Sequence, residues 1–249
     1  MKPVSILPLT GIPPIEPGSD LAQHIGDAIV ASAGLRDRDI VVVCQKVISK
    51  AEGRVVRLRD VVARDKALAF AKKYEKEPAL IELALQEAIE VLRMTDGHLI
   101  TSTAKGFVAA NSGVDRSNQA TSDEATLLPL DSDASASLLR RKLCDRFGVD
   151  IAVVITDTFG RPWRLGQIDF AIGAAGMKVL DDHAGRIDWT GRVLEHTVIA
   201  LADQVAAAAG MVMTKDRGIP AALVRGFHYE SGEENAGNLV RPRAQDLFR

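Results

Sequence analysis

Four short apolar stretches constrain the fold of this 249-residue chain more than any other feature. Each consists of β-branched or other apolar residues between turn residues or charges, a pattern typical of buried strands. Helical segments lie between them, but strands and helices alternate only loosely, and residues 99–130 favour strands and turns. We therefore expect an α+β fold with mixed sheets and helices rather than a regular doubly wound sheet. The predicted strands are residues 4–7, 40–43, 151–155 and 221–224.

Five segments carry the apolar periodicity of an amphipathic helix. Asp20 is the predicted N-cap of the first helix, because an aspartate side chain accepts hydrogen bonds from the first helical turn. Gly148 and Gly210 are predicted to end the fourth and fifth, because glycine tolerates the left-handed conformation that closes many helices. The predicted helices are residues 20–31, 60–74, 78–94, 134–147 and 192–210.

The composition excludes several classes of protein. With 31 Lys and Arg against 33 Asp and Glu, the net charge is −2. The chain therefore lacks the strong positive field that is typical of nucleic-acid-binding proteins. The two cysteines, Cys44 and Cys144, form no CxxC motif, which excludes a disulfide scaffold and a zinc ribbon. No apolar run reaches the ~18 residues of a membrane span and no signal peptide is recognised. We expect a cytoplasmic protein without membrane or nucleic-acid partners.

The densest cluster of reactive side chains follows the third predicted strand. Asp157 and Thr158 stand where that strand ends, and a carboxylate beside a hydroxyl suits Mg²⁺ or Mn²⁺. Arg161 and Arg164 follow three residues apart, a spacing suited to gripping phosphate or carboxylate oxygens. The alternative is a turn capped by Asp157 with two solvated arginines. The arginines and glycines of the same segment favour the functional interpretation.

Three further polar loops are candidates for the same site. Asp115 lies in the loop of residues 106–118 and is a candidate to share a metal with Asp157, the alternative being an Asx-turn loop. Lys50 follows the second strand in a polar turn, where it would neutralise a phosphate or remain a solvated surface lysine. Residues 213–220 precede the fourth strand, either wrapping a nucleotide or forming a plain connection.

Several common catalytic signatures are absent. The sequence has no GxxxxGK[ST] phosphate loop, no complete dinucleotide fingerprint, and no HExxH, GxSxG or Cys–His signature. Its five histidines are dispersed without metal-ligand spacing. We interpret Trp163 and Trp189 as packing anchors rather than stacking platforms.

Taken together, these segments resemble the coenzyme F420-0:L-glutamate ligase family. The run Asp-Thr-Phe-Gly-Arg-Pro-Trp-Arg at 157–164 is highly specific to that family, and Ser-Lys-Ala-Glu-Gly at 49–53 is fairly specific. The resemblance follows the family's order over nearly the whole chain. The matching segments are residues 11–15, 18–21, 39–43, 49–54, 110–118, 156–164, 166–167, 171–173, 218–220 and 224–226.

The resemblance implies a GTP-dependent ligase that adds L-glutamate to the lactyl carboxylate of F420-0, often followed by further γ-linked glutamates. It implies a need for Mn²⁺ or Mg²⁺, assistance by K⁺, and an α+β fold that works as an intertwined homodimer. Because the site segments are scattered along the chain, we expect residues 1–249 to form a single ligase domain. We expect the stand-alone form, since some bacterial members carry an additional nitroreductase-like domain and this chain ends at Arg249.

The resemblance also implies roles for individual residues. Asp115, Asp157 and Thr158 correspond to metal ligands, and we count Asp115, Asp157, Arg161 and Arg164 as the catalytic set. Arg161 and Arg164 are candidates to hold the acceptor's phosphate or the carboxylates of glutamate. The implied nucleotide contacts are Gly11, Ile12, Pro13, Pro14, Gln45, Lys46, Lys50, Asn118, Met213, Thr214, Lys215, Asp216, Arg217, Gly218, Ile219 and Pro220.

Three positions depart from the family pattern. Gln45 and Lys46 stand where members often have a Ser-Thr type pair, and Lys215 stands where we expect a neutral or acidic residue that contacts metal. A protonated lysine has no lone pair for a cation, so one metal contact is missing. Two alternatives therefore stay open: a ligase of the same chemistry for another phosphorylated carboxylate, and a non-catalytic binder of a deazaflavin or nucleotide.

Overall fold

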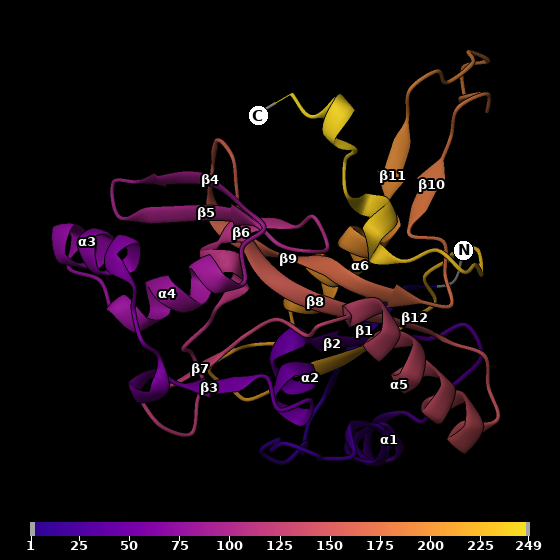
Figure 1. The fold of residues 1–249 in the computed structure, drawn as a ribbon. Coiled ribbons are helices and arrows are strands. Elements are labelled where there is room, and N and C mark those ends of the chain that lie inside the picture. The colour runs from indigo at the N-terminus through magenta and orange to yellow at the C-terminus, as the bar shows by residue number, and fades with distance from the viewer. Residues whose placement is uncertain (1–2, 248–249) are drawn as a thin grey trace.

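A computed structural model describes residues 3–247, so the two residues at each end of the predicted single domain lie outside the described residues. A mixed five-stranded sheet forms its centre (Figure 1). All four predicted strands belong to this sheet, which confirms an α+β fold with mixed sheets. The strands, in spatial order, are β1 (Ser5–Leu9), β12 (Ala221–Arg225), β2 (Ile40–Cys44), β8 (Ala152–Arg161) and β9 (Arg164–Ala175). Only β2 and β8 run parallel, and the other neighbours are antiparallel.

Helices cover both faces of the central sheet. Helices α1 (Leu21–Ser32) and α5 (Ser132–Phe147) lie on one face, and α6 (Leu201–Gly210) lies on the other (Figure 1). Alternate residues of β2 divide between the two cores: Val41 and Val43 pack toward α1 and α5, and Val42 packs toward α6. This alternation, with apolar residues on both sides, is why the second and third strands read as continuous apolar runs.

The helix ends confirm the predicted caps in two of three cases. The Asp20 side chain accepts a hydrogen bond from Gln23 N, and Gly148 closes α5 in the left-handed conformation. Gly210, in contrast, is the last residue inside α6, and Met211 follows as the cap.

A smaller lobe holds its own apolar cores beside the central sheet (Figure 1). Two short helices pack on a three-stranded sheet. A separate two-stranded sheet joins this lobe to the body. The elements are α3 (Asp65–Tyr74), α4 (Pro78–Gln86), β4 (Glu90–Thr95), β5 (His98–Ser102), β6 (Val108–Ala110), β3 (Val55–Arg57) and β7 (Glu124–Thr126).

The predicted helix over residues 78–94 is wrong in its second half. Helix α4 ends at Gln86, and β4 then pairs antiparallel with β5. The turn between these strands passes through Asp96 and Gly97, both with positive φ, as two-residue hairpin turns require. Val91 and Met94 pack against the core formed by α3 and α4. Their three-residue spacing also fits a helix, but here it comes from a partly buried strand.

Two other predicted helices begin later than their patterns indicate. The predicted helix over 60–74 begins at Asp65, after a short 3-10 turn. The one over 192–210 begins at Leu201, because residues before it form β11 (Val198–Ala200), which pairs with β10 (Leu180–Asp182). The segment after β2 is also not a turn: it is the helix α2 (Gln45–Ala51).

The tryptophans are not packing anchors, contrary to our expectation. Trp163 is 82% exposed at the turn between β8 and β9, and Trp189 is 97% exposed beyond β10. Figure 1 shows the β10–β11 hairpin extending away from the body of the molecule. Within residues 3–247, no helix combines the length and the apolar character needed to cross a membrane.

Candidate functional site

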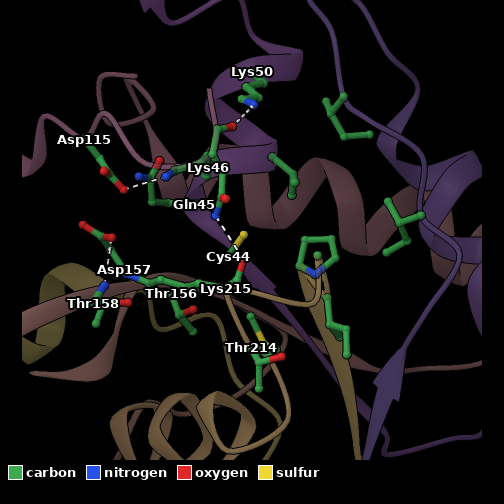
Figure 2. Close-up of a pocket in the computed structure, with 18 of the residues that line it drawn as sticks. Cys44, Gln45, Lys46, Lys50, Asp115, Thr156, Asp157, Thr158, Thr214 and Lys215 are labelled. Atoms are coloured by element: carbon green, nitrogen blue, oxygen red, sulfur yellow. Dashed lines mark hydrogen bonds and ion pairs between the residues drawn. The ribbon is translucent and has the colours of Figure 1, made fainter. Parts of the chain in front are cut away.

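A cavity of about 330 Å³ opens where the parallel strands β2 and β8 end (Figure 2). Cys44 pairs with Thr156 at the last step of this parallel ladder. Beyond that pair the two segments separate. The chain enters α2 directly after β2, whereas β8 continues through Asp157 and Thr158. Crevices of this kind, outside the carboxyl ends of parallel strands, are common ligand sites in proteins.

Most of the residues predicted from the sequence meet in this one cavity. They come from five separate segments of the chain, as the predicted single site requires. The predicted residues that line it are Ile12, Pro13, Pro14, Gln45, Lys46, Lys50, Asp115, Asn118, Asp157, Thr158, Met213, Thr214, Lys215, Gly218, Ile219 and Pro220.

Five predicted residues lie outside the lining. Gly11, Asp216 and Arg217 belong to the loops at the cavity but do not face it. Arg161 and Arg164 face each other across the turn between β8 and β9. At the rise of an extended strand, Arg161 is roughly 13 Å beyond Asp157 along β8. The structure therefore does not bring either arginine to the carboxylates.

Asp169 is the main residue that the sequence interpretation missed. It lies on β9 opposite Thr158, whose hydroxyl donates a hydrogen bond of 2.6 Å to Asp169 Oδ1. The sequence predicts that the third strand ends at residue 155 and that a polar turn follows, whereas β8 continues to Arg161 and forms a long hairpin with β9. The available signal was the two-residue interruption at Pro162 and Trp163 between two extended runs. Cys44, Ile15, Val47 and Thr156 also line the cavity and were not predicted.

Asp157 has the most perturbed carboxyl group in the cavity. Burial, together with the negative charges of Asp115 and Asp169, raises its pKa to about 7. A hydrogen bond of 2.8 Å from Thr158 N and the positive charge of Lys215 oppose this shift. A neighbouring cation would reverse the effect, because opposite charge favours the ionised form.

Asp115 is held by several donors at once. Its Oδ1 accepts from Ser117 N at 2.7 Å, and its Oδ2 accepts from Ser117 Oγ at 2.9 Å. Lys46 Nζ lies 2.6 Å from the same Oδ2. Burial alone raises the pKa of Asp115, but Lys46 and Ser117 outweigh it, and the pKa falls below its usual value. Backbone hydrogen bonds with Thr126 fix the residue beside β7.

Helix α2 supplies a pair of lysines to the cavity. Lys46 and Lys50 are four residues apart, which places them on one face of the helix. Lys50 Nζ donates to Asn118 O at 2.7 Å, and Asn118 Nδ2 donates to Lys215 O at 3.3 Å. Burial, then the nearby charge of Lys46, lowers the pKa of Lys50. The helix thus connects to two of the predicted loops, residues 106–118 directly and residues 213–220 through Asn118.

The carboxylates favour a divalent cation that also binds substrate oxygens. Asp115, Asp157 and Asp169 offer the hard oxygen donors that Mg²⁺ and Mn²⁺ prefer, and all three line the cavity. Nevertheless, among residues 3–247 no group of three or more His, Cys, Asp or Glu side chains is arranged to hold a metal. Magnesium sites commonly use one or two carboxylates plus phosphate oxygens, and these residues fit that pattern.

Apolar residues line the cavity together with the charged ones. Ile12, Pro13 and Ile219 are among them, and Cys44 N donates to Pro220 O at 2.8 Å to fix the second loop. The Thr214 hydroxyl is buried there without a hydrogen-bond partner. Figure 2 shows Thr214 on the opposite side of the cavity from Asp115 and Lys46. A ligand with both anionic and apolar parts matches this mixed lining.

Comparison with known proteins decides the family. A sequence model of the F420-0:Gamma-glutamyl ligase family matches residues 11–226. This chain belongs to that family. The match includes every segment that lines the cavity, from Ile12 to Pro220. The resemblance found in the sequence is therefore confirmed.

Curated relatives of similar length support the same assignment. Coenzyme F420:L-glutamate ligase of Methanothermobacter thermautotrophicus is 38% identical over 250 residues, covering 99% of both chains. The protein of the same name from Methanopyrus kandleri is 40% identical over 240 residues, 94% of this chain and 93% of its own. That of Archaeoglobus fulgidus is 39% identical over 249 residues, covering 99% and 96%.

Proposed function

We propose that this chain is a GTP-dependent ligase that joins L-glutamate to coenzyme F420-0, releasing GDP and phosphate. One observation carries the proposal: segments scattered from Ile12 to Pro220, all within the family match, converge on one cavity that is lined by carboxylates, lysines and apolar residues. The relatives that share the chain's length are named as ligases of F420 and L-glutamate.

The proposed chemistry has two steps. A carboxylate oxygen of F420-0 attacks the γ-phosphorus of GTP, the bond to GDP breaks, and an acyl phosphate forms. The glutamate nitrogen then attacks the acyl carbon, phosphate leaves, and the nitrogen loses a proton to give the amide. Phosphoryl transfer of this kind depends on alignment and charge neutralisation more than on a protein nucleophile. Cys44 suits no nucleophilic role, because burial raises the pKa of its thiol.

The residues of the cavity divide these tasks. Asp115, Asp157 and Thr158 are the proposed ligands of Mn²⁺ or Mg²⁺, which when bound would neutralise phosphate charge. Lys46 and Lys50 would neutralise the remaining charge, as lysines do at phosphate sites. K⁺ is a further proposed activator, supported by the family resemblance alone. Arg161 and Arg164, beyond the cavity, stay proposed anchors for the acceptor's phosphate or for glutamate's carboxylates.

A homodimer is part of the proposal. The β10–β11 hairpin carries three strongly exposed apolar side chains: Ile187 is 70% exposed, Trp189 97% and Val193 60%. Clusters of exposed apolar residues on one projecting element are typical of protein interfaces.

We also propose a cytoplasmic location, consistent with two unpaired cysteines, Cys44 and Cys144.

The test is an incubation of the protein with GTP, Mn²⁺, L-glutamate and F420-0, followed by mass spectrometry. The proposal predicts GDP and a product heavier than F420-0 by one or more glutamyl residues. If no GDP forms, the chain is a binder without turnover. If glutamylation occurs only with another phosphorylated carboxylate, the chemistry is right and the acceptor is wrong.

A further inference from the structure

The ammonium group of Lys46 occupies one of the two carboxylate oxygens with which Asp115 could bind a metal. Lys46 Nζ lies 2.6 Å from Asp115 Oδ2 and also donates to the hydroxyl and the carbonyl oxygen of Ser117. The same Oδ2 accepts from the Ser117 hydroxyl. A carboxylate oxygen offers about two lone pairs, so this oxygen is fully engaged. The other oxygen accepts from Ser117 N and keeps one lone pair.

A divalent ion bound to either oxygen of Asp115 would lie close to the Lys46 ammonium group. A divalent ion bound at Asp115 Oδ2 would take a lone pair from Lys46, and two positive charges a few ångströms apart repel strongly in a partly buried site. The Lys46 side chain is only 12% exposed, so little water is available to replace the lost carboxylate. A displaced Lys46 needs another anion within reach of the cavity. Figure 2 shows its ammonium group at the cavity beside Asp115, with Asp157 nearby.

We propose that Lys46 is a phosphate-positioning residue that exchanges Asp115 for a nucleotide phosphate when the divalent cation binds. The ion pair between Lys46 and Asp115 makes binding of the metal alone less favourable. The exchange makes metal and triphosphate bind better together than either binds alone, and this coupling is reciprocal. The proposal rests on the proposed function in taking a nucleoside triphosphate as the ligand and Asp115 as a ligand of the divalent cation.

Lys50 provides a matched comparison within the same helix. It projects from the same face of α2 and also lines the cavity, but its ammonium group donates to a backbone carbonyl, Asn118 O, at 2.7 Å. Removing Lys50 therefore removes one positive charge without freeing a carboxylate. A difference between the two lysines isolates the exchange from the general effect of charge.

The experiment measures binding rather than turnover in Lys46→Met, Lys46→Arg, Lys50→Met and the unmodified protein. Electron paramagnetic resonance of free Mn²⁺ gives the metal affinity without nucleotide. Titration calorimetry at saturating Mn²⁺ gives the affinity for a GTP analogue with a non-hydrolysable β,γ bridge. Thermal melts establish that each variant is folded.

We expect Lys46→Met to bind Mn²⁺ alone about tenfold more tightly and the analogue about tenfold more weakly, a coupling of ordinary size. Lys46→Arg should have nearly the same affinities for Mn²⁺ alone and for the analogue as the unmodified protein. Lys50→Met should change the affinity for Mn²⁺ alone by about threefold or less, the effect of a nearby charge.

Equal gains in Mn²⁺ affinity for Lys46→Met and Lys50→Met would overturn the exchange and leave only general electrostatics. Unchanged analogue affinity in Lys46→Met would overturn the phosphate contact. If the unmodified protein binds the analogue but Lys46→Met matches it throughout, this inference alone fails. If the unmodified protein binds no analogue with Mn²⁺ present, the proposed function fails and the inference fails with it.

Discussion

Replacing Asp157 by Asn should stabilise the metal-free protein while abolishing ligase activity. Burial and the charges of Asp115 and Asp169 raise the pKa of Asp157 to about 7, from a usual value of 3.8. A carboxyl whose folded-state pKa is raised binds a proton more tightly in the folded state. Its ionisation therefore destabilises the fold as the pH rises above 3.8, and the penalty is complete above about pH 7.

The size of the effect follows from the shift. A shift of about three pKa units means that the ionised Asp157 lowers the free energy of unfolding by roughly 4 kcal/mol above pH 7. At pH 5 the loss is under about 2 kcal/mol. The amide of Asn carries no charge and keeps the acceptor oxygen for Thr158 N, which donates to Asp157 Oδ1 at 2.8 Å. For a chain of this length, realising half of that energy raises Tm by about 4–8 °C near pH 8.

The assay is differential scanning calorimetry with a chelator present, at about pH 5 and about pH 8. The gain in Tm for Asp157→Asn should be at least twice as large at the higher pH. Glu233→Gln, an exposed carboxyl, serves as the control and should show no gain at either pH. A Tm that is unchanged or lowered at pH 8 in Asp157→Asn would refute the reasoning about the buried charge.

Three further predictions concern the fold and the assembly. Asp39→Ala should lower the free energy of unfolding by about 3–5 kcal/mol in urea denaturation, because it leaves Arg225, 2.6 Å from Asp39 Oδ2 and 17% exposed, without its carboxylate; a loss below about 1 kcal/mol would contradict this. Gly173→Ala should cost about 1–3 kcal/mol, since the new Cβ would lie 2.4 Å from Ser132 O, and unchanged thermal melting would show that α5 shifts freely. Trp189→Ser should convert a dimer to a monomer in sedimentation velocity, and an unaltered dimer would place the interface elsewhere.

The central strands and the main carboxylates were predictable from the sequence. Residues 40–43 and 151–155 are runs of apolar residues because both faces of β2 and β8 are covered, and such runs are visible without a structure. Asp115 and Asp157 follow from their place in polar loops next to family motifs. The structure brings both into one cavity.

Features that depend on long-range pairing were not predictable. Asp169 reaches the cavity only because the register of β8 and β9 places it opposite Thr158. The spacing of apolar residues around Val91 fits a helix as well as a buried strand. Only the pairing of β4 with β5 decides between them. The contact between Lys46 and Asp115 joins a helix to a distant loop, so neither residue's neighbours in the sequence indicate it.

The most direct test of the proposed function is the mass of F420-0 after incubation with the protein, GTP, Mn²⁺ and L-glutamate. We predict a product heavier by one or more glutamyl residues, with GDP formed in step, and neither product when Asp157→Asn replaces the unmodified protein. Unaltered F420-0 in the presence of folded, unmodified protein, or full glutamylation by Asp157→Asn, would contradict the function or the metal role proposed for this cavity.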